Sequence, residues 1–147
     1  MTFERVDFDK NISLVVKKKV KSKWGLVRLG DVCDIRDGTH ESPRFIDKGY
    51  PLITSKNITS GMLDFKNVKN ISEKDFVNIN KRSLVENGDI IFAMIGTIGF
   101  PVIVNTTIKF AIKNVALFKK DLSNKLNNYY LKELLNNHIV KEQVKYE

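Results

Sequence analysis

One stretch of the sequence limits the fold more than any other: an apolar run in the middle of the chain. The strand predicted there, residues 89–95, follows the turn-forming pair Asn87 and Gly88 and ends before Gly96. An apolar run without polar alternation predicts a strand that is buried on both faces. A chain of 147 residues can provide this cover, because about 68–70% of its unfolded surface can be buried in one hydrophobic core.

Shorter apolar segments on either side predict further strands, at residues 51–54, 68–71, 102–104 and 110–118. Ser72 is placed to cap a helical turn, and a short helix is expected to begin near Leu29. A final helix is predicted from Asn127, because apolar residues then recur every three or four positions: Tyr130, Leu131, Leu134, Leu135, Ile139 and Val144. This order predicts an α+β domain with a mixed, mostly antiparallel sheet of short strands, flanking helices and a C-terminal amphipathic helix.

The sequence divides into three parts. Residues 1–23 contain a basic run and few large apolar residues, which is typical of an N-terminal extension or linker; residues 24–126 form the expected domain, and residues 127–147 the C-terminal helix. Lys and Arg number 25 against 17 Asp and Glu, a net charge of +8. Such an excess favours nucleic acid or an acidic partner, although a soluble protein with a Lys-rich surface would have the same composition.

Signals of catalysis are weak. His40 and His138 have no metal-ligand neighbours at helical spacing, and we expect no metal site and no cofactor. The serines lack a Gly-x-Ser-x-Gly turn, and no phosphate-binding or adenine-methylation motif is present. A single cysteine, Cys33, and the lack of a secretory leader predict a cytoplasmic protein, and polar residues interrupt every apolar stretch that could span a membrane.

Four polar segments between the apolar elements carry all the candidate base or phosphate contacts of the domain except Thr97: residues 38–44, 54–57, 78–83 and 113–114. Lys, Arg, Asn and hydroxyl side chains are the groups that read base edges and hold phosphates, although each of them is also an ordinary loop residue. The candidate DNA-binding residues are Thr39, His40, Arg44, Lys56, Asn57, Lys81, Arg82, Thr97 and Asn114. Lys17, Lys18 and Lys19 are candidate phosphate contacts in the basic extension.

The order of several short motifs over more than a hundred residues closely resembles the target recognition domain of type I restriction-modification specificity subunits. These motifs are residues 24–35, 37–40, 49–53, 60–61, 71–72, 88–92 and 96–99. The resemblance implies an α/β-type domain that contacts a few base pairs of double-stranded DNA and has no chemistry of its own. It also implies two partners: a modification subunit with its adenine methyltransferase and S-adenosylmethionine, and a restriction subunit for cleavage and translocation.

The sequence departs from the pattern of this family in having one recognition domain and only the start of a spacer helix. It is therefore expected to be a half-subunit or a segment of a longer protein, including one in which a methylase precedes the recognition domain. Pairing with a second recognition domain, or with itself, would use the spacer helices. An alternative is a non-catalytic decoy that binds partner subunits through its last helix without reading DNA.

Overall fold

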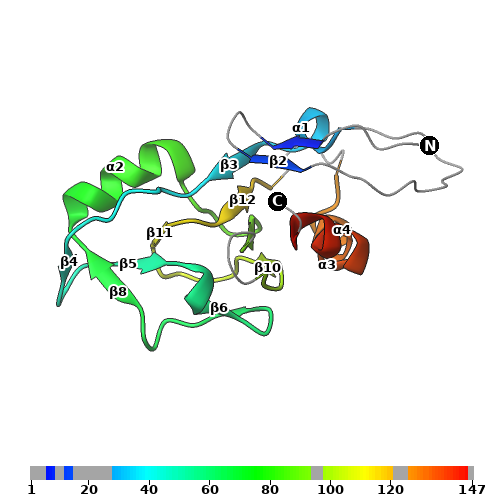
Figure 1. Cartoon of the computed structure of the whole chain (residues 1–147). Coiled ribbons are helices and arrows are strands. Elements are labelled where there is room, and N and C mark those ends of the chain that lie inside the picture. The colour runs from blue at the N-terminus through cyan, green and yellow to red at the C-terminus, as the bar shows by residue number, and fades with distance from the viewer. Residues whose placement is uncertain (1–5, 9–11, 15–27, 94–97, 121–125, 146–147) are drawn as a thin grey trace, which may run out of the picture.

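The protein forms four layers in the order helix, sheet, sheet, helix. A computed structural model describes residues 6–8, 12–14, 28–93, 98–120 and 126–145. In Figure 1, helix α2 lies toward one end of the molecule and helices α3 and α4 toward the other, with strands β11, β12 and β10 between them. The structure confirms the predicted α+β class with mixed, mostly antiparallel sheets.

Each of the two main sheets has four strands. The first has only antiparallel neighbours and the order β10 (Val102–Ile103), β9 (Ile90–Phe92), β12 (Ala116–Phe118) and β3 (Ile35–Asp37). The second has the order β11 (Ala111–Ile112), β5 (Tyr50–Ile53), β8 (Lys69–Ile71) and β4 (Phe45–Ile46), in which β11 is parallel to β5. Two separate hairpins pair β1 (Val6–Phe8) with β2 (Ile12–Leu14), and β6 (Ile58–Thr59) with β7 (Met62–Leu63).

The apolar run in β9 is buried on both faces, as its sequence predicts. Ile90 and Phe92 pack toward helix α3 (Asn128–Asn136), whereas Ile91 faces the second sheet. Strand β12 repeats this pattern: Ala116 and Phe118 pack on the side of α3, and Leu117 packs between the two sheets. Successive side chains of a strand point to opposite faces, so one continuous apolar segment contributes to two cores.

Local capping signals are also confirmed. The Ser72 hydroxyl accepts a hydrogen bond from the Asp75 amide (3.1 Å) at the start of α2 (Glu73–Ser83). Asn127 caps α3 by accepting from the amides of Tyr129 and Tyr130. The remaining helices are α1 (Leu29–Val32), the 3-10 turn η1 (Ser55–Asn57) and α4 (His138–Lys145).

Two element predictions are wrong. The predicted strand at 110–118 is divided into β11 and β12, because Asn114 has a φ of 53° and the chain there leaves the second sheet for the first. The predicted loop at 78–83 is instead the C-terminal half of α2, whose inward side chain Ile79 packs on the second sheet.

The predicted C-terminal helix is two helices. Asn137 ends α3, and its side chain accepts a hydrogen bond from the Ile139 amide (2.9 Å) in the first turn of α4. Leu131 and Leu135 are fully buried against the first sheet, but Tyr130, a member of the same predicted apolar stripe, is 63% exposed. Within the predicted N-terminal extension, the structure contains the β1–β2 hairpin. None of the described helices is long and apolar enough to cross a membrane.

Candidate nucleic-acid interface

Backbone hydrogen bonds bring three of the four polar segments to one place. The Lys113 amide donates to the Ile53 carbonyl at the end of β5 (2.9 Å). On the other side, the Asn114 amide donates to the Thr39 carbonyl (3.1 Å), and Thr39 pairs with Lys113 in a parallel bridge. Residues 39–44, 54–57 and 113–114, which we call the strand-end surface, therefore follow or join strand ends that lie side by side.

Gly38 allows this close approach. A Cβ atom at this position would lie 2.8 Å from the Ile112 carbonyl oxygen, closer than van der Waals contact permits. The Gly38 amide donates to the Val115 carbonyl (3.0 Å). The segment after β3 is therefore anchored to the β11–β12 junction by its backbone.

Two predicted site residues, His40 and Asn114, contact each other directly. Nδ1 of His40 lies 2.9 Å from Oδ1 of Asn114, and Nε2 lies 2.5 Å from Oδ2 of Asp37. The Asp37 side chain is 6% exposed and that of His40 is 54% exposed. A buried carboxylate thus holds a solvent-accessible imidazole, which in turn contacts an amide 74 residues further along the chain.

Hydroxyl and cationic groups surround this contact. The Lys113 ammonium donates to the Ser42 hydroxyl (2.6 Å), and the Thr39 hydroxyl accepts from the Glu41 amide (3.1 Å). Arg44 is exposed at the end of the same segment, immediately before β4. Hydroxyl and ammonium groups close to a half-buried amide, with an exposed guanidinium further along the same segment, form a surface suited to phosphates and base edges.

Lys56 and Asn57 are adjacent in the chain but differ in their surroundings. Lys56 is exposed on η1. Asn57 is 8% exposed, and its Oδ1 accepts from both the amide and the hydroxyl of Thr54 (3.0 Å each). Its Nδ2 donates to the Asp64 carbonyl at 3.4 Å. The Asn57 amide is therefore used within the fold, and reading a base edge would require these bonds to break.

Lys81 and Arg82 lie on a helix and not in the segments that the backbone hydrogen bonds described above bring together. Both are exposed in the last turn of α2, next to Ser83, whose buried hydroxyl donates to the Ile79 carbonyl (3.2 Å). Thr97, Lys17, Lys18 and Lys19 lie outside the described residues. Among the described residues, no group of three or more His, Cys, Asp or Glu side chains could hold a metal ion.

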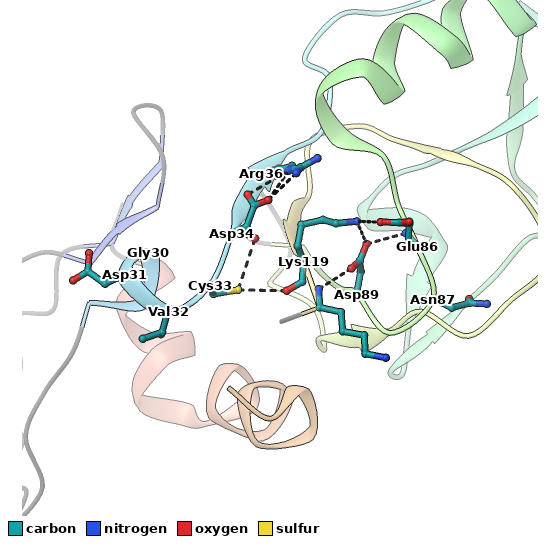
Figure 2. A pocket seen from close by; sticks show the side chains of 11 residues that line it. Gly30, Asp31, Val32, Cys33, Asp34, Arg36, Glu86, Asn87, Asp89 and Lys119 are labelled. Atoms are coloured by element: carbon teal, nitrogen blue, oxygen red, sulfur yellow. Dashed lines mark hydrogen bonds and ion pairs between the residues drawn. The ribbon is translucent and has the colours of Figure 1, made fainter. Parts of the chain in front are cut away.

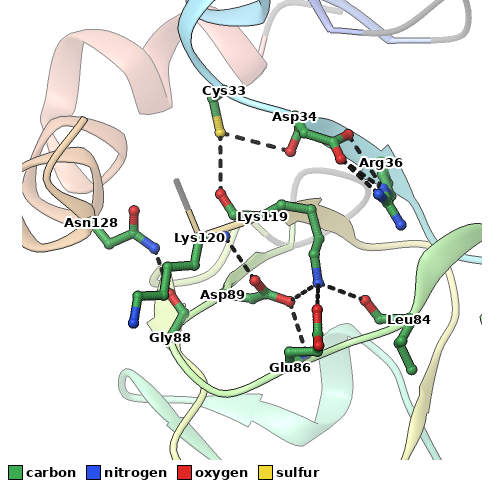
Figure 3. Close-up of polar contacts among 10 residues, drawn as sticks. All are labelled: Cys33, Asp34, Arg36, Leu84, Glu86, Gly88, Asp89, Lys119, Lys120 and Asn128. Atoms are coloured by element: carbon green, nitrogen blue, oxygen red, sulfur yellow. Dashed lines mark hydrogen bonds and ion pairs between the residues drawn. The ribbon is translucent and has the colours of Figure 1, made fainter. Parts of the chain in front are cut away.

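A second polar site, at the other end of β9 and β12, is not predicted by the sequence. The Lys119 ammonium lies 2.6 Å from the Asp89 carboxylate and 2.8 Å from that of Glu86, and it also donates to the Leu84 carbonyl (3.0 Å) (Figure 3). Asp89 accepts in addition from the amides of Glu86 and Lys120 (2.8 Å each). The signal in the sequence is a pair of charged residues next to apolar strands: Asp89 directly precedes β9, and Lys119 directly follows β12.

These ion pairs lie in an open pocket of about 660 Å³ between α1 and the turn before β9 (Figure 2). Lys119 lowers the pKa of Glu86 through a hydrogen bond and charge attraction. On the same wall, Asp34 raises the pKa of Arg36 by accepting a hydrogen bond of 2.7 Å from the guanidinium. Because opposite charges here neutralise one another, the pocket is not suited to attracting a polyanion. Its ion pairs instead join the turn before β9 to the residue that follows β12.

Comparison with known proteins identifies the family. The model of the type I restriction modification DNA specificity domain matches residues 21–146. The chain belongs to this family. It is similar in fold to the HsdS subunit from Thermoanaerobacter tengcongensis, with a TM-score of 0.60 and 18% sequence identity. That match covers 89% of this chain and 31% of the HsdS chain, so the specificity domain spans about a third of that protein. A comparison with curated proteins gives no match.

Proposed function

We propose that this specificity domain reads one half of a split double-stranded DNA target for a type I restriction-modification complex. The observation that supports the proposal best is the strand-end surface. Its anchored backbone carries an exposed imidazole, an amide and three cationic side chains within three adjoining segments: His40, Asn114, Arg44, Lys56 and Lys113.

In this proposal, attraction to the DNA backbone and reading of the base sequence come from different groups. The net charge of +8 attracts the DNA backbone without regard to sequence, whereas base edges must be read by a few side chains on fixed supports. Polar groups on the strand-end surface are held by bonds such as Lys113 to Ser42, which reduces the entropy lost on binding. In this proposal the domain itself is non-catalytic, and a modification subunit and a restriction subunit supply methylation and cleavage.

Selection from a library of random DNA duplexes tests the proposal. The 147-residue chain is mixed with duplexes that share fixed ends and differ in a central window, and the retained duplexes are sequenced. We expect a short motif of a few base pairs to be enriched, with weak affinity because one half-site offers few contacts. Enrichment of no motif, alone and after addition of the cognate modification subunit, would contradict DNA reading by this domain.

A second candidate function, capture of partner subunits without DNA reading, is favoured by one observation. The outer side of α3 exposes large residues: Tyr129 is 73%, Tyr130 63% and Leu134 40% exposed. A pull-down with the modification subunit separates the two functions. Capture that persists after alanine replacement of Arg44, Lys56 and Lys113, together with the absence of an enriched DNA motif, would favour the interaction module.

A further inference from the structure

We infer that Asn114 is a specificity-determining residue and that His40, held by Asp37, is its positioning residue. In this arrangement the Nδ2 group of Asn114 is directed to DNA as a hydrogen-bond donor, and the base it prefers is guanine. The inference rests on the proposed function, because it assigns a role in base reading to particular atoms of the strand-end surface.

The position of Asn114 is fixed by its backbone. Its φ of 53° lies in the left-handed region, at the point where the chain leaves one sheet for the other. Its amide nitrogen donates to the Thr39 carbonyl, and the residue before it is paired with Thr39. The side chain, which is half-buried, therefore starts from a rigid base on a surface that solvent can reach.

The orientation of the amide is set by His40. A carboxylate can only accept hydrogen bonds, so Nε2 of His40 donates to Asp37. Oδ1 of Asn114 is also an acceptor, so its 2.9 Å contact with the other ring nitrogen is a hydrogen bond in which Nδ1 donates to Oδ1. The oxygen of the amide is then turned toward the ring and the NH₂ group away from it. No hydrogen bond to another described residue occupies that NH₂ group.

The chemistry of the outward group limits the bases it can read and favours guanine. An NH₂ donor needs an acceptor, which excludes cytosine. In the major groove adenine N7 and thymine O4 are single acceptors, whereas guanine presents two acceptors side by side, N7 and O6. Adenine is usually read by both atoms of an Asn amide, since it presents one acceptor and one donor. With its oxygen held by His40, Asn114 offers only the donor side. Lys113, the preceding residue, provides a neighbouring cation for the DNA backbone.

An Asn in a left-handed turn is also a common structural residue, because Asn tolerates a positive φ better than most residues. Asn114→Gly separates the two roles. Glycine adopts the same backbone conformation without strain but has no amide to read a base. A turn-forming role alone predicts an unchanged DNA motif, whereas base reading predicts the loss of one position in the motif.

The experiment compares motifs enriched from the random duplex library by the wild-type chain and four variants. Asn114→Gly is expected to reduce the preference for guanine at one position by roughly tenfold, with the other positions unchanged. Asn114→Asp replaces the outward donor by an acceptor, so that the preferred base changes to cytosine or adenine, which present amino groups. His40→Ala should relax the same position as Asn114→Gly. His40→Asn should restore it, because the NH₂ group of Asn can lie near the place of Nδ1 and donate to Asn114.

Each outcome distinguishes the inference from the proposed function. If the wild-type chain enriches no motif, alone and after addition of the cognate modification subunit, DNA reading itself is wrong. If it enriches a motif that Asn114→Gly leaves intact, the proposed function stands and the role of Asn114 is overturned. If Asn114→Gly relaxes one position that His40→Ala does not, the positioning role of His40 is overturned. Thermal unfolding of every variant shows whether a changed motif is accompanied by a loss of folding.

Discussion

The Lys119 ammonium lies 2.6 Å from the Asp89 carboxylate, and the two side chains are only 12% and 1% exposed. This ion pair joins the start of β9 to the residue that follows β12, two neighbouring strands of the first sheet. The adjoining turn also contacts α3, because the Asn128 amide group donates to the Gly88 carbonyl (Figure 3). The pair therefore lies where the first sheet meets the C-terminal helices.

Asp89→Ala is expected to lower the free energy of unfolding by about 3–5 kcal/mol, because it leaves a buried ammonium without its main counter-charge. It also leaves the amides of Glu86 and Lys120 without their acceptor. Urea unfolding followed by circular dichroism measures the change. Glu86→Gln is the matched control on the same ammonium: its carboxylate is 63% exposed, and its loss should cost less than about 1 kcal/mol. Equal costs for the two variants would contradict the burial argument.

Glu86 also predicts a dependence of stability on pH. Lys119 lowers the pKa of Glu86 from its ordinary value of 4.5, so the folded state binds the proton more weakly than the unfolded state does. The stabilisation is then fully present above pH 4.5 and is lost as pH falls through the lower pKa of the folded state. We expect the stability difference between wild type and Glu86→Gln, small because the group is exposed, to disappear at acid pH. Unfolding curves from neutral to acid pH measure it, and a difference that grows as pH falls would have the wrong sign.

The sequence predicts those parts of the fold that depend on local chemistry. The burial of β9 on two faces follows from an apolar run alone, and the caps Ser72 and Asn127 follow from side chains that bond to nearby amides. Such features need no knowledge of distant residues. The family resemblance can also be found in this way, because it depends on short motifs and on their order along the chain.

Features that depend on topology cannot be predicted in this way. The break at Asn114 interrupts a segment of high strand propensity, and it exists because the chain changes sheets there. The contact of His40 with Asn114 joins residues 74 positions apart. Residue type alone assigns Asn57 to base reading, but burial against Thr54 gives it a structural role that composition cannot show.

Asn80 predicts a stabilising substitution. Both polar atoms of its amide are buried on α2 without a hydrogen-bond partner among the described residues. Burying an unpaired amide costs about 1–3 kcal/mol in protein mutational data, so Asn80→Leu is expected to raise the free energy of unfolding by roughly 1 kcal/mol. Asn78→Leu, at an exposed position of the same helix, is the control and should change little. A loss of stability in Asn80→Leu alone would show that the amide has a partner such as a buried water.

Salt dependence separates phosphate contacts from base contacts. If about four phosphates are neutralised, a plot of the logarithm of the affinity against the logarithm of the salt concentration should have a slope of about −3.6. Alanine at Lys17, Lys18 or Lys19 should make this slope shallower by about 0.9 for each phosphate that is no longer neutralised, and it should weaken binding to all sequences alike. Fluorescence anisotropy at several salt concentrations gives the slope. A slope that none of these variants changes would remove the basic extension from the interface.

The neighbours Lys56 and Asn57 are expected to respond in opposite ways to alanine substitution. Lys56 is exposed, and its replacement should leave stability within about 0.5 kcal/mol of wild type, while the affinity for DNA falls. Asn57→Ala removes the side chain of the capping box at η1 and should cost about 1–2 kcal/mol of stability. At a temperature where both variants are folded, Asn57→Ala should enrich the same DNA motif as wild type. A changed motif in a fully folded Asn57→Ala chain would mean that the amide leaves Thr54 to reach a base, and would restore Asn57 to the reading surface.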